Sequence, residues 1–100
     1  MRAKVVVSPQ ARTAADRIDV WWRANRSGSK GLFAREFRRA LSLLAVAPSM
    51  GPRYDGTRPG LRRYFINRTG HHLYYTFDEA TRLLQVVTVW NAISESGPDL

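Results

Sequence analysis

The sequence predicts an α+β domain in which an antiparallel helical hairpin lies on one face of a small, mainly antiparallel sheet. Three observations support this class. A short β-branched segment lies near the start, two segments show the helical spacing of apolar residues, and three strand-like segments follow in close succession. Strands that are separated in this way from a helical pair are typical of α+β proteins. The predicted order is β-α-α-β-β-β, and we expect residues 1–100 to form a single domain with a short tail from about residue 92.

The first strand is predicted at residues 3–7, where three valines precede Ser8 and Pro9. Ser8 is a suitable N-cap and Pro9 suits the first helical position, so we expect a helix that runs to about residue 26. Apolar residues recur along it at the spacing of one helical face: Ala11, Ala14, Ala15, Ile18 and Trp22. Trp22 continues this face and is expected in the core, whereas Trp21, about 100° away around the helix, is expected to be half-exposed.

A second helix is predicted after a short connection at residues 25–29 that is rich in Ser and Gly, and it ends before Pro48. Its apolar residues repeat with helical spacing: Phe33, Phe37, Ala40, Leu41, Leu44 and Ala47. Its opposite side holds Arg35, Arg38, Arg39 and Ser42. The helical pair should therefore have one apolar and one cationic surface.

Residues 48–60 contain too many prolines and glycines for a regular element. A loop of this length in a small domain is more often functional than idle, and Arg53 and Arg58 lie within it. Three strands are then predicted at residues 61–67, 71–77 and 83–90. Their connections have hairpin length, so the three strands should form an antiparallel meander.

Strand alternation assigns the side chains of the meander to two faces. The more apolar row should face the helices and comprises His71, Leu73, Tyr75 and Phe77, which leaves His72 and Tyr74 on the open face. The last strand is apolar on both faces, with Leu84, Val86 and Trp90 on one and Leu83, Val87 and Val89 on the other. A sheet face this apolar should be covered, either by the loop and tail or by a segment of a partner, and we favour the partner.

The formal net charge is +8, and the cations are concentrated in the first three quarters of the chain. All of them except Lys4 and Lys30 are arginines, which favour bidentate contacts with phosphates and carboxylates. We therefore expect an anionic partner, either nucleic acid or an acidic protein segment. The chain has no cysteine and only two histidines, so neither a metal site nor a cofactor is expected. No segment has the character of a signal peptide or a membrane span, which predicts a cytoplasmic protein.

Several short motifs accompany this order of elements. The second helix ends with Ala40, Leu41, Leu43 and Leu44 before Pro48 and a glycine-containing loop. The motifs that follow are Pro59-Gly60-Leu61-Arg62-Arg63, His72-Leu73-Tyr74-Tyr75 and Val89-Trp90-Asn91. Together with the length and the charge, they resemble the RelE/ParE superfamily of toxins from bacterial type II toxin–antitoxin modules. The resemblance extends from Lys4 to about Pro98.

The resemblance implies a partner and two alternative targets. RelE-like members are ribosome-dependent mRNA endonucleases, and ParE-like members inhibit DNA gyrase. Both are neutralised by a cognate antitoxin that wraps an acidic, partly disordered segment around the toxin, so a toxin–antitoxin hetero-oligomer is expected. RelE-like nucleases usually carry a Tyr or a His–Tyr pair near the end of the last strand. This chain has Trp90 and Asn91 there, which favours the ParE-like branch and argues against an enzyme. Many ParE-like chains also carry a His after the last strand, so the branch stays open.

RNA cleavage through the ribose 2′-hydroxyl requires a base, an acid and cations around the phosphate. If the chain is a nuclease, the candidate catalytic residues are Arg58, Arg62, Arg63 and His72. The residues expected to contact the antitoxin or the target are Arg35, Arg38, Arg39, Arg53, Arg58, Arg62, Arg63, Tyr74 and Trp90. A small basic nucleic-acid-binding module is the third interpretation, since the charge alone is sufficient for phosphate contacts.

Overall fold

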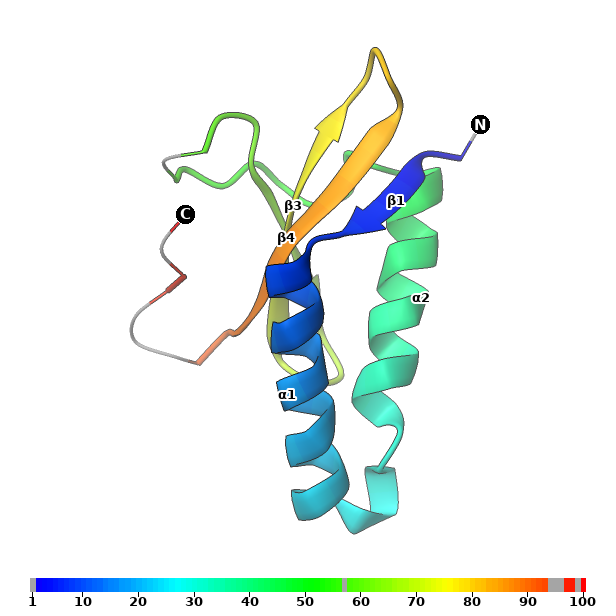
Figure 1. Cartoon of the computed structure of the whole chain (residues 1–100), viewed down its shortest axis with the longest axis vertical. Coiled ribbons are helices and arrows are strands. Elements are labelled where there is room, and N and C mark those ends of the chain that lie inside the picture. The colour runs from blue at the N-terminus through cyan, green and yellow to red at the C-terminus, as the bar shows by residue number, and fades with distance from the viewer. Residues whose placement is uncertain (1, 57, 94–96, 99) are drawn as a thin grey trace.

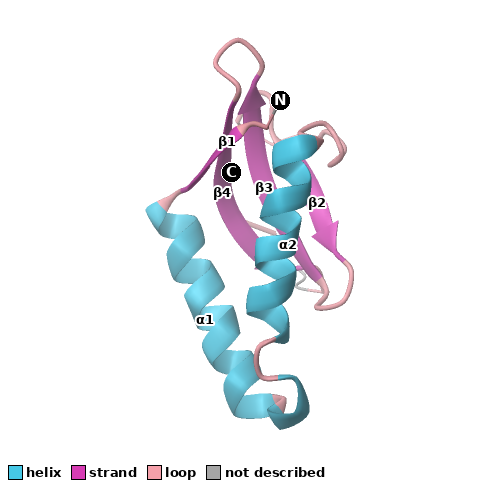
Figure 2. Cartoon of the chain, turned by 90° about the vertical axis from the view of Figure 1, so that its right-hand side faces the viewer, coloured by secondary structure: helices cyan, strands magenta, loops and turns pink. Residues whose placement is uncertain are grey.

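Two helices cover one face of a four-stranded sheet in the computed structural model of the chain (Figures 1 and 2). The structure describes residues 2–56, 58–93, 97, 98 and 100. The elements along the chain are β1 (Lys4–Val7), α1 (Pro9–Asn25), the short 3-10 helix η1 (Ser27–Ser29), α2 (Leu32–Val46), β2 (Arg62–Ile66), β3 (His71–Asp78) and β4 (Leu83–Asn91). The predicted α+β class and the predicted order of the elements are confirmed.

The strand order in the sheet is β1-β4-β3-β2. The two pairings within the meander are antiparallel, whereas β1 runs parallel to β4. A parallel pair needs a long crossover, and the helical hairpin of α1 and α2 belongs to that crossover. The helices run antiparallel to each other and extend beyond one end of the sheet (Figure 1).

Ser8 both begins α1 and fastens it to the sheet. Its hydroxyl accepts a hydrogen bond from the Ala11 N–H at 3.0 Å and donates one to the Val87 carbonyl at 2.9 Å. The expected N-cap, with Pro9 in the first turn, is therefore confirmed. Ala11 and Ala15 are buried, and their small side chains let α1 approach β4 closely.

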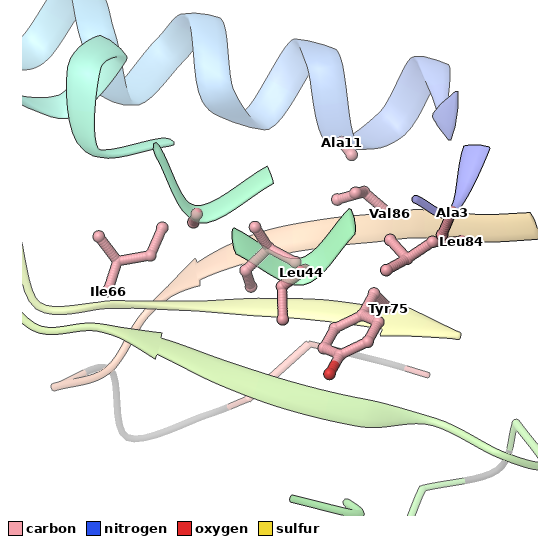
Figure 3. Close-up of a cluster of buried hydrophobic side chains, with 9 residues drawn as sticks. Ala3, Ala11, Leu44, Ile66, Tyr75, Leu84 and Val86 are labelled. Carbon is pink, nitrogen blue, oxygen red and sulfur yellow. The ribbon is translucent and has the colours of Figure 1, made fainter. Parts of the chain in front are cut away.

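The core lies between the helices and the sheet. Its main cluster combines Ala3, which precedes β1, with residues of both helices and the meander, among them Ala11, Leu44, Ile66, Tyr75, Leu84 and Val86 (Figure 3). A second cluster of Ala15, Phe33 and Val89 continues the core towards the end of the hairpin, and Trp22 packs against it. Trp21 is 49% exposed. The prediction for Trp21 is confirmed, whereas Trp22 packs against the core but is only partly buried.

A β-bulge in β4 changes which face its side chains occupy. Tyr74 pairs with Thr88 and Tyr75 with Val86, so Val87 is an extra residue without its own partner on β3. Val89 consequently joins the helix-facing core, and Trp90 packs with Tyr74 on the opposite face. The prediction that Trp90 shares a face with Leu84 and Val86 is wrong, because uniform alternation allows for no extra residue.

The face of β2, β3 and β4 that points away from the helices, called the open face below, is partly covered by the chain itself. Leu61, Tyr74 and Val87 are buried there, and Tyr54, Trp90 and Leu100 pack against them. The expectation that a partner covers this apolar face is therefore wrong for its central part, because Tyr54 of the loop and Leu100 supply the cover. Within the described residues, no helix has both the length and the apolar character that a membrane crossing requires.

Candidate functional site

The first part of the long loop is tied to the helix-facing side of the sheet by two side chains. The Tyr75 hydroxyl donates to the Pro48 carbonyl at 2.6 Å and accepts from the Gly51 N–H at 2.9 Å. Arg62 donates to the carbonyls of Gly51 at 2.8 Å and Ser49 at 3.3 Å. Among these bonds, the one from the buried Gly51 N–H satisfies a donor that water does not reach. The role of Arg62 is thus to hold the loop.

The next part of the loop crosses to the open face. Backbone hydrogen bonds of 3.0 Å, from Arg63 to Pro52 and from Tyr54 to Leu61, hold it beside β2. The Tyr54 ring then lies edge-on against Tyr74, with 5.1 Å between centroids, and the Arg63 guanidinium carbon is 4.7 Å from the Tyr54 centroid. Arg63 is therefore a cation of the open face, held there by a cation–π contact.

The arginines that the sequence places close together are separated in the structure. Arg62 and Arg63 are consecutive strand residues and point to opposite faces. Arg58 lines a shallow groove beside Ser8 and Val87. Arg53 lines a different pocket of about 340 Å³, together with Arg62, Arg82, Phe77, Glu79 and neighbouring loop residues. The candidate nuclease residues Arg58, Arg62 and Arg63 thus do not converge on one point.

His72 lies on the open face between two aromatic rings. Its centroid is 5.2 Å from that of Phe65 and 6.2 Å from that of Tyr74. Burial and, to a lesser extent, the Arg63 cation lower the pKa of His72 from its ordinary value of 6.5, so the ring is neutral at pH 7. Its Nδ1 is buried and has no hydrogen-bond partner among the described residues. A neutral imidazole can accept a proton, but this buried nitrogen is closed to a substrate.

Tyr74, Asn91 and His71 are each engaged in packing or hydrogen bonds within the chain. Tyr74 is only 2% exposed, so neither an RNA hydroxyl nor an antitoxin reaches it without displacing the loop. The Asn91 side chain accepts a hydrogen bond from the Ile93 N–H at 3.0 Å and so shapes the turn after β4. His71 faces the helices as expected, where it contacts the Phe33 ring, and its Nδ1 lies 3.0 Å from the Thr69 hydroxyl. Its role is structural.

A second candidate surface is the groove between α1 and α2, with a volume of about 460 Å³. Apolar side chains line it: Val7, Ala15, Phe33, Ala34, Phe37 and Leu41. Charged side chains also line it: Arg12, Asp16, Asp19, Arg23 and Arg38. Asp19 pairs with Arg23 at 3.0 Å, which leaves Arg12 and Arg38 as the cations of the groove that form no ion pair with a described residue. Arg35, Arg38 and Arg39 are all exposed on α2.

The sequence interpretation missed three residues of these surfaces. Arg12 is not among the residues predicted to contact a partner, although it lies one turn before Asp16 on the same side of α1. Phe65, which is 44% exposed, was not selected although strand alternation from Arg63 already placed it on the open face. The position of Tyr54 could not be predicted, because no local sequence pattern indicates where a loop residue will pack.

The fold and these surfaces define a class: a small basic α+β protein with two helices on a four-stranded mixed sheet and a cationic face on α2. The family model described as ParE toxin of type II toxin-antitoxin system, parDE, matches residues 5–92. The chain therefore belongs to the ParE toxin family, and it is the toxin of a type II toxin–antitoxin system.

Solved structures share the fold at low sequence identity. A chain of the chromosomal ParDE system from P. aeruginosa is 14% identical, with a TM-score of 0.71 over 90% of this chain and 96% of that chain. The RelBE2 toxin–antitoxin complex of Mycobacterium tuberculosis contains a chain that is 15% identical, with a TM-score of 0.68. The match covers 91% of this chain and 99% of that chain. A mutant of the E. coli toxin RelE in the free state is 15% identical, with a TM-score of 0.61. The match covers 95% of this chain and 88% of that chain. None of the curated proteins matches the chain.

Proposed function

We propose that this toxin acts in the cytoplasm as a ParE-like inhibitor of DNA gyrase, and that it acts by binding rather than by catalysis. The observation that carries the proposal is the family match over residues 5–92, together with an open face whose only histidine is neutral and lies between aromatic rings. A binding mechanism requires surface and charge but no acid–base pair. The net charge of +8 suits a complex that contains DNA.

The test is the supercoiling of relaxed plasmid by purified gyrase with increasing amounts of the protein. We expect supercoiling to fall and cleaved plasmid to accumulate at micromolar toxin, because an inhibitor that stalls the gyrase–DNA complex leaves broken DNA. Heat-unfolded protein at the same concentration controls for nonspecific binding of a basic polypeptide to DNA. Undiminished supercoiling at micromolar protein contradicts the proposal.

Messenger RNA cleavage on the ribosome is the second candidate function. Two observations favour it: the fold is shared with E. coli RelE, and Arg63 lies close enough to His72 to lower the pKa of that histidine. Arg63 would stabilise the charge on the phosphate, and His72 would take the proton. Mapping of mRNA ends after induction distinguishes the candidates, since a nuclease produces cuts at fixed codon positions. Intact mRNA removes this candidate.

We infer that the cognate antitoxin binds the groove between α1 and α2 through an acidic, amphipathic segment that becomes ordered on binding. The apolar residues of the groove match the apolar face of such a segment, and Arg12 and Arg38 match its carboxylates. The open face is less suitable as the main antitoxin site, because Tyr54 and Leu61 already cover its centre. The product of a short reading frame next to the toxin gene is the natural partner for co-purification, and failure to form a complex would count against this role.

A further inference from the structure

Two arginines are held directly opposite each other where the long loop meets β2. Arg53 and Arg62 form an antiparallel bridge, and backbone hydrogen bonds of 3.0 Å between the residues on either side of them close it. Since these bonds flank the pair, the two arginines face each other without a backbone bond of their own. In such a pair the side chains share a face and come close together, and like charges destabilise the pairing. An anion between the two guanidinium groups would offset this repulsion.

A third arginine reaches the same place from the turn between β3 and β4. Among the described residues, Arg82 is the only one other than glycine with a positive φ, which is 58°. This left-handed conformation favours a residue without a side chain, because a Cβ atom crowds the backbone there. The guanidinium carbon of Arg82 lies 5.1 Å from the centroid of the Phe77 ring. A long cationic side chain at a strained position points to a use for that side chain.

The three arginines line one pocket of about 340 Å³, called the arginine pocket below. Its only acidic lining residue is Glu79, so two formal positive charges remain among the described residues that line it. Neither Arg53 nor Arg62 forms an ion pair with a described residue. Arg62 is already held by two loop carbonyls, the nearer at 2.8 Å, which lowers the entropy cost of using its charge for binding. The arginine pocket therefore suits a small anion with two negative charges.

We propose that the arginine pocket binds a phosphate dianion, either inorganic phosphate or the terminal phosphate of a small monoester, between Arg53, Arg62 and Arg82. Guanidinium groups match phosphate oxygens in bidentate geometry, and two negative charges balance the two positive charges that remain. A phosphodiester carries one negative charge, so the expected ligand is a small anion and not the backbone of a nucleic acid.

The arginine pocket is separate from the surfaces described above. The turn that carries Arg82 lies at the opposite end of the molecule from η1 (Figure 1). Among the described residues, the pocket shares none of its lining with the groove between α1 and α2. Phosphate binding is therefore independent of gyrase inhibition and of the antitoxin site.

The experiment is isothermal titration calorimetry of the purified full chain at constant ionic strength and about pH 8, where phosphate monoesters are dianions. The probes are inorganic phosphate, glycerol phosphate and the diester dimethyl phosphate. We expect at least one of the two dianions to bind, and the diester to bind about tenfold more weakly or less, since it offers fewer charged oxygens. The tighter dianion identifies the source of the phosphate. Equal affinity for the diester, or no binding of any probe, would overturn the proposal.

Two variants remove a cation without removing the bonds that hold the loop. Arg53→Gln changes an exposed side chain and should weaken phosphate binding about tenfold, since it removes a hydrogen bond between charged groups. Arg82→Gly suits the left-handed backbone, so it should keep the fold and show a similar loss. Arg17→Gln is the matched control, because Arg17 is exposed on α1, lies outside the pocket and carries the same charge. Equal losses for Arg17→Gln and Arg53→Gln would show diffuse attraction and contradict a built site.

Thermal unfolding adds a readout that a purely structural role of Arg53 would not change. In chloride, Arg53→Gln should melt at the same temperature as the parent protein or above it, because the repulsion with Arg62 is relieved. In phosphate of equal ionic strength the parent protein should gain more than the variant, since only the parent retains the full site. General stabilisation by phosphate acts on both proteins alike. An equal gain in both proteins would therefore count against binding in the arginine pocket.

Discussion

Tyr75 connects the sheet to the loop through one hydroxyl, which satisfies both the Pro48 carbonyl and the Gly51 N–H. Tyr75→Phe keeps the buried ring and leaves both backbone groups without this partner. We expect the free energy of unfolding to fall by about 1–3 kcal/mol, the cost of unsatisfied buried polar groups. Urea unfolding, monitored by circular dichroism, measures this change in the free energy of unfolding.

Tyr64→Phe is the control for this prediction, because the described part of the chain gives the Tyr64 hydroxyl no hydrogen bond. It should change the free energy of unfolding by less than about 0.5 kcal/mol. Equal stability of the Tyr75→Phe variant and the parent protein would show that water replaces the hydroxyl, and that the loop is not fastened in this way.

His71 makes the stability depend on pH. Burial is the main cause that lowers its pKa from 6.5, His72 adds to the shift, and the hydrogen bond with Thr69 opposes it. The unfolded chain therefore takes up a proton at higher pH than the folded chain does. The free energy of unfolding should be constant above about pH 7 and should decrease as the pH falls through about 6.5 towards 5.

Chemical unfolding at several pH values tests this prediction about His71. The pKa of His72 is also lowered, so the comparison should be made in a His72→Gln background, where only His71 titrates between pH 5 and 7. A free energy of unfolding that stays constant over this range would show that His71 is not buried as described.

At the scale of the elements, local periodicity predicted the helices and β3 well. The helical spacing identified Phe33, Ala40 and Leu44 as buried, and alternation assigned His71 and His72 to opposite faces of β3. The same rule failed in β4, because the bulge at Val87 depends on how β4 pairs with β3, and no local pattern records it. Trp90 thereby lies on the open face.

Gly51 determines how closely the loop approaches the sheet. A Cβ atom at this position would lie 2.7 Å from the Tyr75 hydroxyl oxygen and 3.0 Å from the backbone oxygen of Arg63. We expect Gly51→Ala to push the loop away from β2 and to cost about 1–3 kcal/mol of unfolding free energy, as overpacking does. Thermal unfolding monitors the loss, and hydrogen exchange at Tyr54 and Arg63 reports the loosened loop.

Gly28→Ala is the matched control, since a Cβ there has no neighbour within 4 Å. It should leave the stability unchanged or raise it by a few tenths of a kcal/mol, because alanine restricts the unfolded chain. If the two variants are equally stable, the approach of loop and sheet is not limited by the side chain at position 51.

At the scale of the molecule, the loop decides which predicted contacts are available. The sequence predicts both its presence and the cationic face of α2. The structure shows that Tyr54 covers Tyr74 and that Arg62 holds Ser49 and Gly51. Such contacts join residues that are distant along the chain, so neither composition nor periodicity indicates them. The cationic face of α2 needed only helical spacing and was predicted correctly.

The net charge should steer an acidic antitoxin towards the toxin whichever surface it binds, whereas only charges in contact with it slow its release. Arg38→Glu, in the groove between α1 and α2, and Arg53→Glu, in the pocket beside β2, change the net charge equally. We expect both variants to slow association to a similar extent, and the effect should shrink at high salt. Arg38→Glu alone should also speed dissociation, by about tenfold, since it places a carboxylate against the acidic segment.

Stopped-flow association and surface-based dissociation measurements with the antitoxin separate the two rates. Equal dissociation rates for the two variants would move the antitoxin out of this groove.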